Sequence, residues 1–174
     1  MKNIITKFGI YAGLIVGVWV VLLAAIGDSL NMDYGMLYGY TAMLLSFSMI
    51  YVAVKTYRDT YNGGYVSFGR AFRIGLGITL IASTFYVVVW LIEYHFFVPD
   101  FYDVYAARAA EKMQAEGATE AEIQAAGSQI ASFRELAENP LIHALITYTE
   151  ILPVGLLVSL IAALILKKKP LPAL

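Results

Sequence analysis

Four long stretches of the chain are almost entirely apolar, and the polar residues are gathered between them. The stretches cover residues 8–26, 35–54, 71–92 and 141–166. About 20 apolar residues in a helix cross the hydrocarbon core of a bilayer, so each stretch predicts a transmembrane helix. The pattern predicts an all-α, polytopic membrane protein that forms a single membrane domain over residues 1–174.

The first stretch also allows another interpretation, a cleaved signal peptide, because Ala25-Ile26-Gly27 resembles a small-residue cleavage site. The apolar core of a signal peptide is shorter, about 7–15 residues. We therefore interpret the first stretch as a membrane span.

Residues 98–140, between the third and fourth spans, are the only polar segment of any size. Pro99 suits a first helical turn, and Gly117 favours the end of a helix. Thr119 and Glu122 match a capping box at the start of a second helix. The sequence predicts a helical hairpin of about 40 residues, too small to have its own core. It must lean on the membrane surface, on the bundle or on another protein.

Basic residues are distributed unevenly between the two ends of the spans. Nine of the 12 Lys and Arg fall on one side: Lys2, Lys7, Lys55, Arg58, Arg70, Arg73, Lys167, Lys168 and Lys169. The other side has Arg108, Lys112 and Arg134, together with most of the acidic residues, including Asp28 and Asp33. Cytoplasmic loops are enriched in Lys and Arg. We therefore expect both termini in the cytoplasm and residues 98–140 outside.

Composition narrows the range of functions. The chain has no cysteine, which excludes disulfides, thiolate catalysis and cysteine metal sites. With two histidines, we expect no metal site built from the protein alone. No nucleophile–base set, P-loop or dinucleotide fingerprint occurs. We expect a protein that is not an enzyme, with no cofactor and no nucleic-acid partner, and with membrane lipid around it.

Small residues recur at three- or four-residue spacing in every span, which is the pattern that lets helix backbones approach closely in a membrane. The candidate packing glycines are Gly9, Gly13, Gly17, Gly35, Gly39 and Gly155. Packing inside the bundle is the simpler interpretation. Alternatively, the track in the first span faces a second copy or a partner protein.

The loop between the second and third spans carries Arg58, Arg70 and Arg73 beside the inner leaflet. Basic residues in this position can bind lipid phosphates, so we consider these arginines candidate head-group contacts. Membrane topology alone would also place them there.

Glu150 is the residue that stands out chemically. It lies roughly 13 Å into the fourth span, where a carboxylate costs a few kcal/mol and is by default a functional candidate. Thr149 is its neighbour, Pro153 cannot donate to the Thr149 carbonyl, and His143 is two turns earlier. Three roles stay open: a protonated side chain bonded to a hydroxyl of another span (Thr79, Ser83, Thr84 or Tyr86), a proton- or cation-coupled site, and a binding site for lipid or for another membrane protein.

The order of several motifs resembles the bacterial integral membrane family named domain of unknown function 4199, which is common in Bacteroidetes. The matching stretches are Gly27-Asp28-Ser29, Tyr57-Arg58-Asp59, Ser67-Phe68-Gly69-Arg70-Ala71-Phe72-Arg73-Ile74-Gly75, Pro99-Asp100-Phe101, residues 112–118, Asn139-Pro140 and residues 153–160. The resemblance covers nearly the whole chain and implies a bacterial inner-membrane protein. It implies no activity.

These observations favour a non-catalytic accessory or scaffold protein of the inner membrane, acting through helix packing and its external hairpin. Its partner would be a second copy, as a homo-oligomer, or another inner-membrane protein. The alternative is a small homo-oligomeric proton-coupled transporter with Glu150 as the coupling carboxylate. A membrane enzyme acting on lipid ranks third, because the carboxylates and arginines do not converge in sequence.

Overall fold

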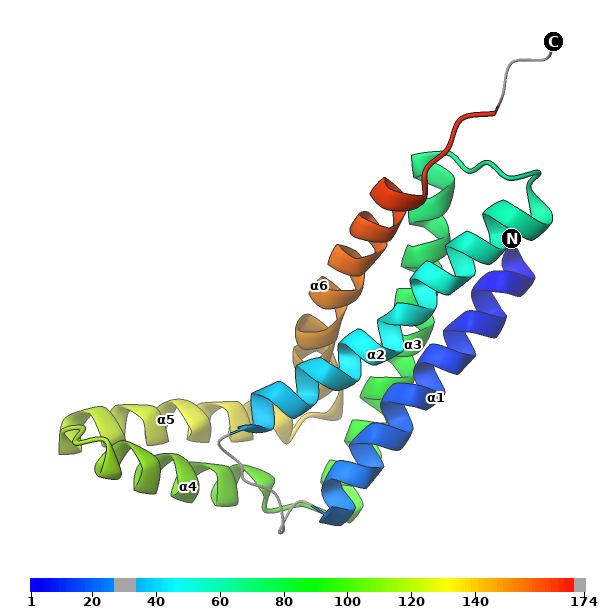
Figure 1. Cartoon of the computed structure of the whole chain (residues 1–174). Coiled ribbons are helices and arrows are strands. Elements are labelled where there is room, and N and C mark those ends of the chain that lie inside the picture. Colours follow the sequence, from blue (N-terminus) through cyan, green and yellow to red (C-terminus); the bar gives the residue numbers. More distant parts are fainter. Residues whose placement is uncertain (27–33, 171–174) are drawn as a thin grey trace. The chain divides into compact units, whose positions relative to one another are not determined.

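The structure is a computed structural model that describes residues 1–26 and 34–170. Its elements are α1 (Lys2–Ile26), α2 (Gly35–Thr56), the π-helical turn η3 (Tyr57–Tyr61), α3 (Phe68–Phe96), α4 (Phe101–Ala115), α5 (Glu120–Ala137) and α6 (Pro140–Leu166) (Figure 1). No strand occurs among these described residues, so the predicted all-α class is confirmed.

Four helical stretches are long and apolar enough to cross a membrane: α1, α2 with η3, α3 and α6. They contain the four predicted spans and extend beyond several of their ends, because the helices continue into flanking polar residues such as Lys2 and Glu93. Asn139 caps α6, since its side-chain oxygen accepts from the Leu141 N–H at 3.0 Å. Asp28 and Asp33, which we expect on the outer side, lie outside the described residues, as does the stretch Gly27-Asp28-Ser29.

The chain divides into two compact units, which are described separately. The first comprises Met1–Trp90 and Thr147–Leu174, and the second comprises Leu91–Ile146. Both α3 and α6 begin in one unit and end in the other.

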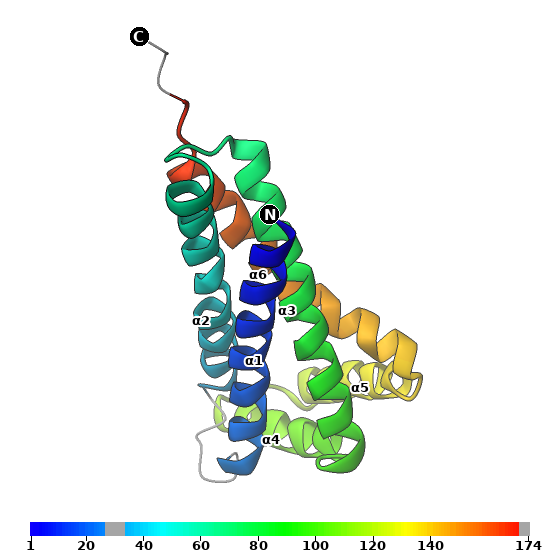
Figure 2. The ribbon, with the colours of Figure 1, turned by 90° about the vertical axis from the view of Figure 1, so that its right-hand side faces the viewer.

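In the first unit, α3 contacts each of the other three helices (Figure 2). The α1 glycine track faces α3: a Cβ at Gly9 would lie 2.8 Å from Ile81, and one at Gly13 would meet the Phe85 ring. The Ser46 hydroxyl of α2 donates to the Ala12 carbonyl of α1 at 2.8 Å. Small residues thus bring the backbones of α1, α2 and α3 close together.

The contact between α3 and α6 also uses small residues. A Cβ at Gly75 would lie 2.6 Å from the Ser159 hydroxyl, and one at Gly155 would meet Thr79. The Thr79 and Ser159 hydroxyls share a hydrogen bond of 3.2 Å, and both side chains are fully buried. Gly35 and Gly39 of α2 differ, because a Cβ at either would meet nothing within 4 Å among the described residues.

Ser83 of α3 differs from Thr79 in its hydrogen bonding. Its side chain is fully buried, and its hydroxyl has no hydrogen-bond partner among the described residues. An unpaired buried hydroxyl costs about 1–3 kcal/mol. We therefore expect Ser83→Ala to raise the unfolding free energy of the detergent-solubilised protein, by up to about 1 kcal/mol after the lost volume is subtracted.

Ser159→Ala is the matched change with the opposite expectation, because it removes the partner of the Thr79 hydroxyl. Thermal unfolding of both variants and of the parent protein shows whether each substitution raises or lowers the unfolding free energy. A Ser83→Ala variant less stable than the parent would mean that the Ser83 hydroxyl has a partner in the membrane.

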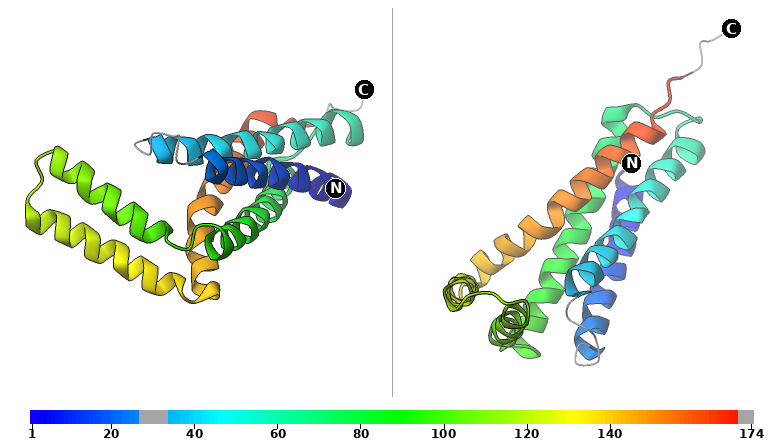
Figure 3. Two further views of the ribbon diagram at one scale, coloured as in Figure 1. Left: turned by 90° about the horizontal axis from the view of Figure 1, so that it is seen from below. Right: turned by 60° about the vertical axis from the view of Figure 1, so that its left-hand side comes forward.

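The second unit is built mainly from the hairpin of α4 and α5, which run side by side in opposite directions (Figure 3). Gly117 makes the turn with φ +83°, a conformation that favours glycine. The Arg134 guanidinium of α5 pairs with the Asp103 carboxylate of α4 at 2.7 Å. Neither helix has a buried residue except Ala137, as expected for a hairpin without its own core.

The capping box predicted at the start of α5 is confirmed. The Thr119 backbone N–H and hydroxyl both donate to a Glu122 carboxylate oxygen at 2.8 Å. In return, the Glu122 backbone N–H donates to the Thr119 hydroxyl at 3.4 Å. The backbone bond from Thr119, followed by the hydroxyl bond, holds the pKa of the Glu122 carboxyl below its ordinary value.

The capping box makes the first turn of α5 sensitive to pH. A carboxyl whose pKa is lower in the folded state stabilises that state above the unfolded pKa, and the contribution is lost as the pH falls through the folded value. We expect amide exchange at residues 120–123, corrected for intrinsic rates, to accelerate relative to the middle of α5 when the pH falls from 7 to below 4. Glu122→Gln is the control and should abolish this pH dependence; an unchanged dependence would assign the effect to another group.

Candidate functional site

The second unit buries two ionisable side chains. Of its residues, all of which are described, three are buried: Glu93 at the end of α3, Ala137, and His143 at the start of α6. Glu93 is 6% exposed and His143 is 2% exposed. Glutamate is almost never fully buried without a partner, so Glu93 and His143 are candidate functional residues.

Aromatic rings surround the histidine. The Tyr94 ring meets the His143 ring edge to face, with 4.6 Å between centroids, and the Tyr102 ring lies 6.3 Å away. Tyr94 and Tyr102 also contact each other at 5.7 Å. Three segments, the last turn of α3, the start of α4 and the start of α6, therefore supply one aromatic cluster around a buried imidazole.

Glu93 makes no hydrogen bond or ion pair with a side chain of the part of the chain that the structure describes. Within the same described part, no group of three or more metal-ligating side chains occurs. A buried carboxyl and a buried imidazole can each bind and release protons, and burial makes their charged forms costly. The chemistry that the cluster supports is proton binding.

The sequence prediction included His143 but not its neighbours. The available signal was the position of Glu93 directly after the apolar run 87–92. A carboxylate that follows an uninterrupted apolar run is a candidate for burial.

The other residues of the predicted intramembrane site, Glu150, Thr149 and Pro153, lie in the first unit, whereas His143 lies in the second. The side chains of all three are exposed on the surface of α6. Glu150 makes no hydrogen bond or ion pair to the described residues. Two of the hydroxyls proposed as its partners bond other side chains: Thr79 bonds Ser159, and Thr84 bonds Tyr148 at 2.8 Å.

The predicted head-group arginines make bonds within the chain. Arg58 pairs with the Asp59 carboxylate at 2.6 Å and 3.1 Å, and it donates to the Leu166 carbonyl at 3.4 Å. Arg70 donates to the Asn62 side-chain oxygen at 3.1 Å, and Arg73 to the Gly69 carbonyl at 3.2 Å. Their role in lipid binding stays a prediction.

Comparison with protein families assigns the chain. The model of a family described as a protein of unknown function, DUF4199, matches residues 7–168. The chain belongs to the DUF4199 family. No curated protein and no solved structure matches it.

The DUF4199 match includes both candidate carboxylates, Glu93 and Glu150, together with His143 and the basic residues up to Lys168. The family resemblance inferred from the motifs is therefore confirmed. The family description carries no activity, so a function for this DUF4199 chain has to be argued from its own residues.

Proposed function

We propose that this protein is a non-catalytic accessory protein of the bacterial inner membrane, which binds another membrane protein or a second copy of itself through α6. The observation that supports this is the exposed carboxyl group of Glu150 on a transmembrane helix. Glu150 lies roughly 15 Å along α6 from its first residue, which is deep enough to place it in the hydrocarbon core of a bilayer.

The cost of that position points to a protein neighbour. A carboxyl in the middle of a span costs about 2.5–3.5 kcal/mol on insertion scales, and such groups normally face other protein groups. Around Glu150, the exposed face of α6 is apolar, with Leu156, Leu157, Leu160 and Ile161 exposed. Lipid tails give Glu150 no hydrogen-bond partner, whereas a helix packed on this face does.

Photo-crosslinking in native membranes tests the proposal. Leu157 lies two turns after Glu150 on the same face of α6, and Val18 lies on α1; each is 57% exposed. A photoreactive residue at 157 should give a specific crosslinked product, and one at 18 should not. Glu150→Leu should remove the product, whereas Glu150→Gln, which keeps hydrogen-bonding groups, should retain it. Crosslinks to lipid alone at 157 would contradict the proposal.

The proposed topology places both termini in the cytoplasm and the α4–α5 hairpin outside. The uneven distribution of Lys and Arg supports this topology. In the first unit, the segments that carry most of these basic residues, which are the start of α1, the 57–67 loop and the end of α6, lie at one end (Figures 1 and 2). Because the chain has no cysteine, Ser128→Cys gives a single labelling site. An impermeant thiol reagent should label it from outside intact cells; labelling only in inverted vesicles would reverse the topology.

A homo-oligomeric proton-coupled transporter is the second candidate. The same exposed Glu150 favours it, because a carboxyl on the outer face of one chain would line the axis between several copies. Glu150→Gln separates the two candidates. For an accessory protein the variant should keep both its crosslink and its phenotype. For a transporter it should keep the crosslink and lose proton uptake into vesicles.

A further inference from the structure

The basic end of the first unit contains a cavity built from two segments that are far apart in the sequence. The cavity has a volume of about 300 Å³. It is lined by residues of the loop before α3 and of the segment after α6: Gly63, Gly64, Tyr65, Lys168, Lys169 and Pro170. We propose that this cavity, which we call the lysine pocket, binds a phosphate group, such as that of an anionic lipid head group.

The two segments are held together by backbone hydrogen bonds. The Val66 N–H donates to the Lys168 carbonyl at 3.1 Å, and the Lys168 N–H donates to the Val66 carbonyl at 2.9 Å. Val66 is fully buried. The two bonds therefore hold the backbone of Lys168 beside the loop.

Glycines open the loop side of the pocket. Gly63 and Gly64 have φ values of +63° and +84°, which favour glycine over other residues. A Cβ at Gly64 would have nothing within 4 Å, so that side of the lining is bare backbone. The Asn62 amide donates to the Tyr65 carbonyl at 2.6 Å and fixes the turn. A ligand can therefore approach the backbone closely beside two ammonium groups.

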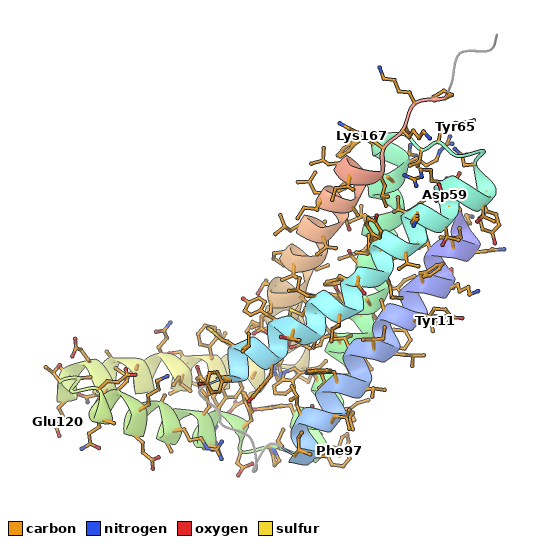
Figure 4. The ribbon with its side chains drawn as sticks, viewed as in Figure 1. Tyr11, Asp59, Tyr65, Phe97, Glu120 and Lys167 are labelled. Atoms are coloured by element: carbon orange, nitrogen blue, oxygen red, sulfur yellow. The ribbon has the colours of Figure 1, made fainter. Side chains whose placement is uncertain are left out.

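The charges at this end suit an anion. Two lysines and no acidic residue line the pocket. The nearby acid, Asp59, is bonded twice by the Arg58 guanidinium and also feels the positive charge of Lys168 more weakly. Arg58 also donates to the Leu166 carbonyl, which offsets the negative end of α6. Figure 4 shows Asp59, Tyr65 and Lys167 at this same end of the first unit.

The membrane supplies such an anion. Lysines beside the membrane surface are attracted to anionic head groups, and lysine binds phosphate as a compact point charge. The pocket differs from the arginines considered in the sequence, because Arg58, Arg70 and Arg73 make bonds within the chain. The described residues offer the ammonium groups of Lys168 and Lys169 no ion pair.

Lipid retention by the full-length protein tests the inference. The protein is extracted from nanodiscs of phosphatidylglycerol or phosphatidylcholine, and bound lipid is counted by native mass spectrometry. Lys168→Gln/Lys169→Gln should reduce retained phosphatidylglycerol about 25-fold, a factor of about five for each lysine. The control, Lys2→Gln/Lys167→Gln, removes the same number of charges from residues that do not line the pocket and should retain more phosphatidylglycerol than the pocket variant does.

A competition experiment identifies the source of the phosphate. Millimolar inorganic phosphate should leave phosphatidylglycerol bound to the parent protein, because the lipid tails add affinity. Displacement by inorganic phosphate that requires both pocket lysines would support the phosphate site and assign it to a soluble ligand. Equal losses in the pocket and control variants, or equal retention of both lipids by the parent, would overturn the inference and leave only general attraction to a basic surface.

Discussion

Replacing Gly13 by leucine is expected to abolish the folded yield of the protein in mild detergent. A Cβ at this position would already lie 2.5 Å from the Phe85 ring of α3, and a leucine adds three further carbons. Contacts this close force one of the two helices to shift. Because the track at Gly9, Gly13 and Gly17 packs against α3, α1 cannot make room for the leucine and stay packed on α3. Overpacking of this kind costs about 1–3 kcal/mol or more, and here it separates two helices.

Gly39→Leu is the matched control, because it makes the same substitution in a span where a Cβ would meet nothing within 4 Å. Size-exclusion chromatography after solubilisation measures the folded fraction of both variants. The Gly39 variant should elute as the parent protein does, whereas the Gly13 variant should aggregate. Equal folded fractions would show that α1 does not pack on α3 through its glycine track.

Glu93→Leu is expected to stabilise the protein by about 1–3 kcal/mol, because it replaces a carboxyl group that is only 6% exposed by an apolar side chain. Leucine has a similar volume and needs no hydrogen-bond partner, and such replacements in protein interiors are often neutral or stabilising. Thermal unfolding in nanodiscs measures the effect. A rise in Tm together with loss of the protein's cellular phenotype would identify Glu93 as a functional residue that is kept at the expense of stability.

Tyr94→Phe is the companion variant, because it keeps the ring that contacts His143 and removes only a hydroxyl. Thermal unfolding of this variant separates the contribution of the hydroxyl from that of the ring contact. If Glu93→Leu instead lowers Tm, Glu93 has a bonding partner in the membrane.

The sequence by itself determined the class of protein and most of its elements. A span needs only a run of apolar residues of sufficient length, so all four spans were predictable without any knowledge of packing. The capping box at Thr119 and Glu122, the cap at Asn139 and the turn at Gly117 were also predictable, because each depends on residues within a few positions of one another.

The tertiary structure alone decided which faces of the helices are covered. Sequence spacing identified small-residue tracks in every span, but only packing distinguished Gly13, which faces Phe85, from Gly39, which faces no described residue. The same holds for the carboxylates: Glu150, in the middle of a span, is exposed, and Glu93, near the end of another, is buried. Burial depends on neighbours from distant parts of the chain, and no local pattern records which segments, such as Val66 and Lys168, will meet.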